Sequence, residues 1–287
     1  MIENFVVFIL TYGRPDNVKT YKTLKRFGYT GKIYLICSDD DKQIELYKNN
    51  YKNEVIVFSK DKYKNTFDIA DNFKKMDSVI YARNACFDIA KDLGIKYFLQ
   101  LDDDYTDFSY RFNDKLSYNN TRGFINKVDY VFLAILNFYK KISAKSIAIS
   151  QNGDWIGGKD SGWAKDLSLK RKCMNSFFCS TERPFKFIGR MNDDVNTYTR
   201  LGTLGDLFLT IPNISLKQTD TQSSQGGLTE MYLSAGTYVK SFYSVMFNPS
   251  SVSVFPMGTH QRLHHRINWN NTVPKILNEK HKKNGTK

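Results

Sequence analysis

Short continuous apolar runs, separated by segments with helical spacing, constrain the fold of this chain most strongly. Four of these runs lie in the first half of the chain, at residues 5–11, 32–38, 54–60 and 96–101. A strand buried on both faces has such a run, and strands that alternate with helices pair mostly in parallel. The sequence therefore predicts an α/β fold with a mostly parallel central sheet flanked by helices.

Helices and further strands are expected around these four runs. Pro15 suits the first turn of a helix that ends at Gly28. Beyond the fourth run the regular alternation stops, and a long amphipathic segment follows. Helices are predicted at residues 15–28, 39–51, 78–94 and 121–142, strands at 145–150 and 205–211, and a helix followed by a strand at 228–244.

The domain organisation follows from these elements and from the composition. We expect one domain over residues 1–275, with a nucleotide-binding half at 1–110 and an elaborated acceptor half at 111–275. Residues 276–287 are basic, and we expect them to be disordered. The hydrophobic fraction of 41% is enough for a sizeable core and excludes a disordered chain.

The cysteines and the lack of long apolar runs indicate a reducing compartment without a membrane span. No C-x-x-C pair is present, which favours buried free thiols at all four cysteines: Cys37, Cys86, Cys173 and Cys179. The apolar start at residues 5–10 is too short for a signal peptide, and no apolar run reaches ~18 residues. We therefore expect a cytoplasmic protein with no membrane partner.

The charge balance favours an anionic partner. The formal net charge is +13, which suits nucleic acid, acidic lipid or a phosphorylated substrate. The alternative is a lysine- and asparagine-rich composition whose solvated surface is basic without a partner. The charge alone leaves both open.

Polar residues follow three of the predicted strands at their carboxyl ends, where open α/β sheets bind ligands. These are Thr11–Tyr12–Gly13–Arg14, Ser38–Asp39–Asp40–Asp41 and Asp102–Asp103–Asp104. Neither a G-x-G-x-x-G motif after the first strand nor a P-loop is present. The usual dinucleotide and P-loop phosphate sites therefore lose their main sequence support.

The three consecutive aspartates predict a cation site. Side chains at the first and third positions of a strand end point the same way, so Asp102 and Asp104 could share one hard divalent cation. Mg²⁺ or Mn²⁺ would take its other ligands from water and a diphosphate. Asp103 points the other way and would contact a ribose or sugar, or orient the site. The alternative is a solvated acidic turn.

The stretch YARNACFDIAKDLGIKYFLQLDDDY resembles glycosyltransferases of the GT-A fold, in which A-R-N, a glycine and a D-x-D strand end occur in this order. The matching positions are Ala82–Arg83–Asn84, Gly94 and Asp102–Asp104, whereas Cys86 stands where many of these enzymes have glycine. The resemblance implies a GT-A-like (Rossmann-like) fold and a sugar-nucleotide donor. The implied donor-binding residues are Thr11, Tyr12, Gly13, Arg14, Asp39, Arg83, Asn84, Asp102, Asp103 and Arg266.

Longer motifs are similar to the TET/JBP-associated glycosyltransferases, found mainly in phages. They include FILTYGRPDNVKT, GRMNDDVNTYTRLG, YVKSFYSVMF and RLHHRINW. This resemblance implies transfer of a sugar from a UDP-sugar to a hydroxymethylated pyrimidine in double-stranded DNA, with Mn²⁺ or Mg²⁺ as cofactor. The cell compartment would then be the host cytoplasm. The sugar (glucose or a pentose such as arabinose) and the base (cytosine or uracil) are left open.

The acidic pair Asp193–Asp194 is the candidate catalytic base. By order along the chain it matches the acidic residue that opens a helix below the acceptor in GT-A enzymes, and Asp194 is the first choice. The alternative is helix capping. A base would favour inversion, although retaining enzymes share the same metal motif.

Three of the four histidines cluster near the end of the chain. GT-A enzymes often take a metal ligand from a C-terminal histidine, so His264 and His265 are candidates ahead of His260. The alternative is a basic surface patch together with Arg262 and Arg266.

Residues for the DNA acceptor are the remaining candidates. Trp155 and Trp163 could stack on an extruded base, or could be core residues under a glycine-rich loop. The loop at 218–227 could close over the donor or be a solvated linker. Basic candidates for contacts with the phosphates are Lys170, Arg171, Lys172 and Arg190.

Two other functions remain possible from the sequence. A GT-A glycosyltransferase could act on a carbohydrate or protein acceptor, with an incidental basic surface. An inactive DNA-binding module on the same fold would need none of the acidic residues.

Overall fold

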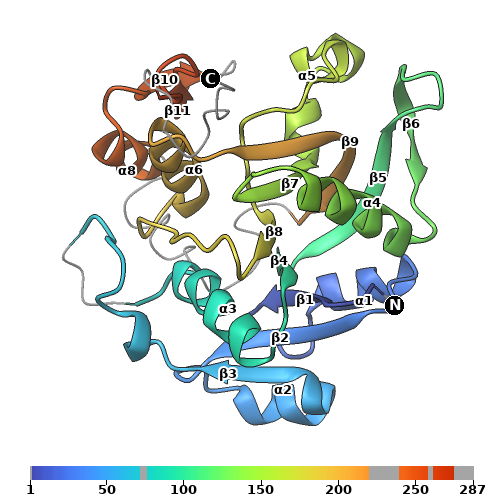
Figure 1. Cartoon of the computed structure of the whole chain (residues 1–287), viewed down its shortest axis with the longest axis vertical. Coiled ribbons are helices and arrows are strands. Elements are labelled where there is room, and N and C mark those ends of the chain that lie inside the picture. Colours follow the sequence, from blue (N-terminus) through green and yellow to red (C-terminus); the bar gives the residue numbers. More distant parts are fainter. Residues whose placement is uncertain (1, 72–75, 220–238, 258–260, 275–287) are drawn as a thin grey trace, which may run out of the picture.

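The computed structural model describes residues 2–71, 76–219, 239–257 and 261–274. The first half contains β1 (Phe5–Leu10), α1 (Lys19–Arg26), β2 (Lys32–Ser38), α2 (Ile44–Tyr51), β3 (Val55–Phe58), α3 (Ile80–Asp92) and β4 (Tyr97–Asp102). The second half contains β5 (Tyr105–Phe112), β6 (Tyr118–Phe124), α4 (Val128–Lys141), β7 (Ser146–Gln151), α5 (Gly162–Lys165), β8 (Ser176–Ser180), α6 (Asp193–Thr203), β9 (Phe208–Gln218), α8 (Val239–Phe247), β10 (Val252–Met257) and β11 (Arg262–Ile267). Figure 1 shows these elements.

The central sheet confirms the predicted α/β class. In the described chain its order is β3-β2-β1-β4-β8-β7-β9-β5-β6. The strands from β3 to β4 are parallel, as the apolar runs predicted. From β8 onward the sheet is mixed: β8 is antiparallel to β4 and β7, and β5 is antiparallel to β6 and β9. The parallel half carries the three polar strand ends.

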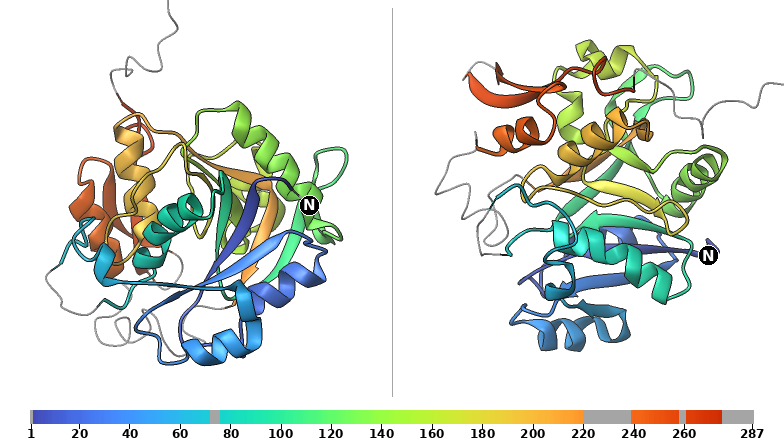
Figure 2. Two further views of the ribbon diagram at one scale, coloured as in Figure 1. Left: turned by 60° about the horizontal axis from the view of Figure 1, so that its bottom comes forward. Right: turned by 60° about the vertical axis from the view of Figure 1, so that its left-hand side comes forward.

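The sheet is covered on both faces, because successive residues of β1 point to opposite sides. Val7 and Ile9 join a core cluster with α1, α2 and α4, whereas Val6 and Phe8 join a second cluster with α3 and α6. Figure 2 shows these helices on either side of the strands. The helix α6 that begins with the acidic pair therefore lies on the same face as α3.

Gly28 ends the first helical segment as predicted, and only glycine suits this position. Its φ is +75°, and an added Cβ would lie 3.0 Å from the carbonyl oxygen of Asn126. The left-handed conformation is strained for other residues, and the close approach leaves no room for a side chain. The turn brings the chain back along the sheet into β2.

Several predicted elements were wrong. Pro15 lies in a turn, and α1 begins only at Lys19. The predicted helix at 121–142 is strand β6 up to Phe124 and helix α4 from Val128. The predicted strand in 228–244 is helix α8 where the structure describes it. At 121–124 the pairing of β6 with β5 in a hairpin at the sheet edge overrides the helical pattern.

Other expectations concern the membrane, the thiols and the ends of the chain. All four cysteines are buried and free, as predicted. Among the described helices, none has the length and apolarity required to cross a bilayer. The predictions for residues 220–227 and 276–287 lie outside the described residues, and the division into two halves stays a prediction.

Phe132 tests the packing of α4 on the sheet. Its ring is fully buried and contacts four other aromatic rings: Phe5, Tyr29, Phe108 and Phe178. Phe132→Ala should lower the free energy of unfolding by about 3–5 kcal/mol, through lost burial and a cavity. The matched control is Tyr130→Ala on the same helix, where the side chain is 67% exposed. Equal losses in urea unfolding of both variants would contradict this packing.

Candidate active site

The ends of β1, β2 and β4 meet at one edge of the sheet, as parallel pairing requires. Thr11 donates from Oγ1 to Asp103 Oδ2 at 2.7 Å, and the Arg14 guanidinium pairs with the other Asp103 oxygen at 3.1 Å. The backbone N–H of Gly13 donates to Asp41 Oδ2 at 2.7 Å. The loop after β1 is therefore tied to both neighbouring strand ends.

Tyr12 and Asp39 lie exposed beside this edge. The Tyr12 ring is 44% exposed, and the Lys60 ammonium lies 5.0 Å from its centre. Asp39 accepts from the Lys60 backbone N–H at 3.1 Å. Lys60 and Tyr47 were missed by the sequence prediction. Tyr47 contacts Thr11 Oγ1 and accepts from the Arg14 backbone N–H, each at 2.8 Å, and only tertiary structure brings it there.

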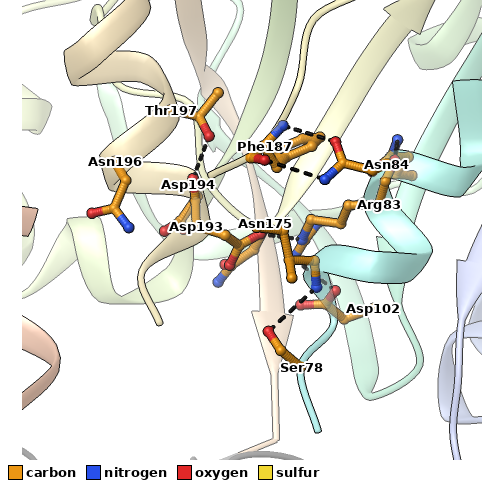
Figure 3. A network of polar contacts seen from close by, with 12 residues as sticks. Ser78, Arg83, Asn84, Asp102, Asn175, Phe187, Asp193, Asp194, Asn196 and Thr197 are labelled. Atoms are coloured by element: carbon orange, nitrogen blue, oxygen red, sulfur yellow. Dashed lines mark hydrogen bonds and ion pairs between the residues drawn. The ribbon is translucent and has the colours of Figure 1, made fainter. Parts of the chain in front are cut away.

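Arg83 joins the two halves of the site. It is 2% exposed, and its guanidinium lies 3.0 Å from Asp102 Oδ1 and 2.8 Å from Asp193 Oδ2. The rings of Phe177 and Phe187 lie 4.9 and 5.7 Å from the same guanidinium. Figure 3 shows Arg83 between Asp102 at the end of β4 and Asp193 at the start of α6.

Asn84 holds the segment that leads to α6. Its amide donates to the Phe187 carbonyl at 3.2 Å and accepts from the Phe187 N–H at 2.9 Å. This pair of bonds satisfies both ends of a buried backbone group (Figure 3). Asn84 was predicted among the donor-binding residues, and here its contacts are with the protein backbone.

Asp104 differs from its two neighbours. Its Oδ1 is buried without a hydrogen-bond partner in the described chain, and its Oδ2 accepts from the Gln218 amide at 3.3 Å. Burial, together with the charges of Asp102 and Asp103, raises the pKa of Asp104 to about 7. A buried carboxylate oxygen without a protein partner is chemically suited to a water molecule or a cation.

Asp193 and Asp194 open α6, and both are buried. Burial raises the pKa of each carboxyl, and the Arg83 charge acts in the opposite direction. Asp194 Oδ1 accepts from the Val195 N–H at 2.7 Å. The Asp193 carboxylate is paired with Arg83, whereas Asp194 has no ion pair in the described chain.

The histidines lie on β11, close to the start of α6. His265 Nδ1 is 3.4 Å from the Asn192 amide, and the two imidazole rings are 4.3 Å apart between centres. Burial lowers the pKa of His265 to about 3, helped by nearby His264, Lys240 and Lys172, so its ring is neutral. Within the described part of the chain, no three metal-ligating side chains come together. His260 lies outside it.

The DNA candidates separate into buried and accessible residues. Trp155 is 5% exposed, and its indole N–H donates to Ser150 Oγ at 3.0 Å. Of the two alternatives for Trp155, the structure therefore favours a core residue. Arg190 is 1% exposed and pairs with Asp71 at 2.7 Å and Asp77 at 3.2 Å, so its guanidinium is held by carboxylates. Trp163 is half-buried, with the ammonium groups of Lys170 and Lys172 within 5.6 Å of its ring.

Comparison with known proteins identifies a family. A model described as TET-Associated Glycosyltransferase matches residues 5–227. The search of curated proteins found no match.

Solved structures give weaker similarities. Staphylococcus aureus TarS (residues 1–349) is 12% identical, with a TM-score of 0.44, over 85% of this chain and 64% of that one. Mycobacterium tuberculosis glucosyl-3-phosphoglycerate synthase with Mn²⁺, UDP and phosphoglyceric acid is 12% identical, with a TM-score of 0.43, over 92% and 86%. A Pyrobaculum calidifontis mannosyltransferase with GDP-Man and Mn²⁺ is 8% identical, with a TM-score of 0.44, over 86% and 72%. The chain thus spans about two thirds of the TarS fragment.

The raised pKa of Asp104 gives a test of the site without any ligand. The folded state keeps the Asp104 proton up to a pH of about 7, whereas the unfolded state releases it near pH 4. The folded state therefore binds more protons in this window, and stability falls as the pH rises through it. Asp104→Asn should gain stability relative to the wild type by roughly 4 kcal/mol between about pH 4 and pH 8, since about three pKa units at ~1.4 kcal/mol each separate the folded and unfolded states.

Urea unfolding in EDTA across this pH range measures the difference. The control is Asp92→Asn, an exposed carboxylate at the end of α3, which should show no such trend. A wild-type minus Asp104→Asn difference that stays constant with pH would contradict the assignment.

Proposed function

This chain belongs to the TET-associated glycosyltransferase family, and we propose that it transfers a sugar from a UDP-sugar to the hydroxyl of 5-hydroxymethylcytosine or 5-hydroxymethyluracil in DNA. The observation that carries the proposal is the buried network Asp102–Arg83–Asp193, which connects the donor edge of the sheet to the helix of the candidate base. A transferase needs donor and acceptor groups held together in one site.

The donor is assigned to the edge formed by β1, β2 and β4. The exposed Tyr12 ring and the Asp39 carboxylate offer a stacking face and an acceptor for a nucleoside. Arg14 lies at the same edge on Asp103, where it can also neutralise part of a diphosphate. Acidic residues at this edge would repel a diphosphate alone. They suit a diphosphate that binds together with a divalent cation.

The residues at this edge fit a divalent cation. Among the described residues, Asp104 Oδ1 is buried without a hydrogen-bond partner, and Asp102 has a second oxygen beside the one that Arg83 holds. Asp102 and Asp104 would hold Mn²⁺ or Mg²⁺, which would neutralise charge on the leaving diphosphate. His264 and His265 remain candidates for a further ligand, and the neutral ring of His265 is in the form that binds metal.

Asp194 is the favoured base. Asp193 is committed to Arg83, so Asp194 is the carboxylate that can accept a proton without losing an ion pair. Its raised pKa makes it a stronger base than an exposed aspartate. Asp194 takes the proton of the hydroxymethyl group, the oxygen bonds to the anomeric carbon of the sugar, and the bond from that carbon to UDP breaks with inversion. The proton rests on Asp194 and the electron pair leaves with UDP.

Mass spectrometry of nucleosides tests the reaction directly. The protein should convert 5-hydroxymethylpyrimidine DNA to a glycosylated nucleoside with at least one sugar from a UDP-sugar panel that includes glucose and arabinose. Asp194→Asn should lower kcat by about 10²–10⁴ and leave UDP affinity unchanged, because the amide cannot take the proton. The exposed loop variant Asp160→Asn is the control.

Asp193→Asn should behave differently from Asp194→Asn. It leaves the buried Arg83 guanidinium without one of its two acidic partners and should cost about 3–5 kcal/mol of stability.

Labelling of carbohydrate or protein acceptors and never of DNA would overturn the proposal. Full activity of Asp194→Asn would overturn the assignment of the base.

The affinity for metal should depend on pH through Asp104. A carboxylate must lose its proton to bind a metal, and the pKa of Asp104 is raised to about 7. Mn²⁺ affinity, measured by electron paramagnetic resonance without donor, should fall by roughly tenfold per pH unit below about pH 7. Asp104→Asn should bind Mn²⁺ weakly at every pH. A pH-independent wild-type affinity would contradict the role of Asp104.

A further inference from the structure

A groove of about 530 Å³ lies beside the C-terminal hairpin β10–β11, away from the three aspartates. It is lined by Ser253, Arg266, Ile267, Asn268, Trp269 and Asn270. Figures 1 and 2 show this hairpin and α8 beside α6, at the end of the molecule opposite β3 and α2. The lining combines a guanidinium, an indole and amide side chains, which are groups that contact nucleic acids.

Arg266 lines the groove, and Arg171 lies beside it over the Trp269 ring. The Arg266 guanidinium lies 5.0 Å from the ring centre of Phe255, which is 46% exposed on the paired strand. The Arg171 guanidinium lies 5.5 Å from the Trp269 ring. Among the described residues, neither arginine has a carboxylate within ion-pair distance, in contrast to the buried Arg83 and Arg190.

The groove connects to the candidate base through α6. Trp269 stacks on Tyr198, with ring centres 5.9 Å apart and planes at 14°. Tyr198 lies four residues after Asp194, on the same face of the helix. On the hairpin, His265 is next to Arg266 and contacts Asn192, which precedes the acidic pair. The groove is therefore connected to the candidate base by direct packing, from Trp269 to Tyr198 and along α6 to Asp194.

We propose that this groove binds the phosphate backbone of the acceptor DNA through Arg171 and Arg266, and this inference rests on the proposed function. Guanidinium groups bind phosphate oxygens in a planar, bidentate manner, and their positions here are fixed by the aromatic rings. Asp194 is only 6% exposed, so a base within an intact duplex cannot reach it. A backbone held at the groove would keep the strand in place while the target base rotates toward Asp194.

This assignment moves Arg266 from the donor to the acceptor. The resemblance placed it at the diphosphate, whereas in the structure its contacts are with Phe255 and Ser253 on the hairpin surface. The net charge of +13 supplies the long-range attraction for DNA, and the two arginines supply a defined contact.

Fluorescence anisotropy with a labelled 5-hydroxymethylcytosine duplex tests the proposal. The double variant R171Q/R266Q should bind this DNA roughly tenfold more weakly than the wild type at low salt. The slope of log affinity against log salt concentration should fall by about 0.9 for each phosphate contact that is lost. Lys141→Gln, an exposed charge at the end of α4, is the control for charge alone.

UDP affinity, measured by calorimetry on the same variants, separates the two roles of Arg266. A loss of UDP affinity with unchanged DNA affinity would overturn the inference and return Arg266 to the donor. Unchanged DNA affinity and salt slope in the double variant, with the same cooperative unfolding as the wild type, would also overturn it. So would an equal loss in Lys141→Gln.

The failure of the proposed function would look different. In that case the wild type would transfer no sugar to hydroxymethylated DNA, while DNA binding would still depend on Arg171 and Arg266. That result would support a DNA surface on a protein with another acceptor chemistry. If the wild type transferred sugar to DNA and the double variant bound DNA normally, the inference about the groove would be wrong and the proposed function would stand.

Discussion

The ion pairs of the buried Arg83 guanidinium are the interaction on which the site depends. Arg83 comes from α3, and its two acidic partners come from the last residue of β4 and the first residue of α6. A buried charge of this kind is costly unless every partner stays in place. The guanidinium therefore fixes the distance between the donor edge and the candidate base. The aromatic rings of Phe177 and Phe187 exclude water from it and strengthen the same contacts.

Burial is the main reason why the pKa values of the carboxyl groups near Arg83 are raised. Five carboxyl groups lie at the end of β4 and the start of α6, and in the described chain their ion pairs are with Arg14 and Arg83. The carboxyl groups are Asp102, Asp103, Asp104, Asp193 and Asp194. Desolvation is the largest cause of each shift, and the arginines offset it only in part. Buried carboxyl groups that outnumber their arginine partners favour binding of a cation or of a proton. The proposed reaction requires both: a divalent cation at the diphosphate and a carboxylate that accepts the proton of the hydroxyl group.

The sequence predicted the parallel half of the fold and failed where packing overrides local pattern. The apolar runs of β1, β2 and β4 are decisive because a strand buried on both faces leaves little ambiguity. The segment after Asp104 is different: Tyr105–Phe112 lacks a continuous apolar run, and its partner Tyr118–Phe124 leads directly into the helical spacing of α4. Only the hairpin contact decides between the two. Likewise, the sequence placed Arg83 at the donor and Arg190 at the DNA, whereas the structure buries both and pairs them with carboxylates.

The net charge is +13, yet the candidate active site is acidic. This contrast matters because the proposed reaction brings two anionic substrates, a UDP-sugar and a DNA strand, to one protein. The five carboxyl groups, where ionised, would repel both a UDP-sugar and a DNA strand. Arg83 and Arg14 offset two of them, and a divalent cation at Asp104 would offset two more charges. The DNA strand needs a separate positive surface, because the acidic pair that would deprotonate its hydroxymethyl group repels its phosphates. Two arginines held on aromatic rings beside α6 meet that need. In the proposed arrangement they would attract the DNA backbone close to Asp194 from positions outside the group of five carboxyls.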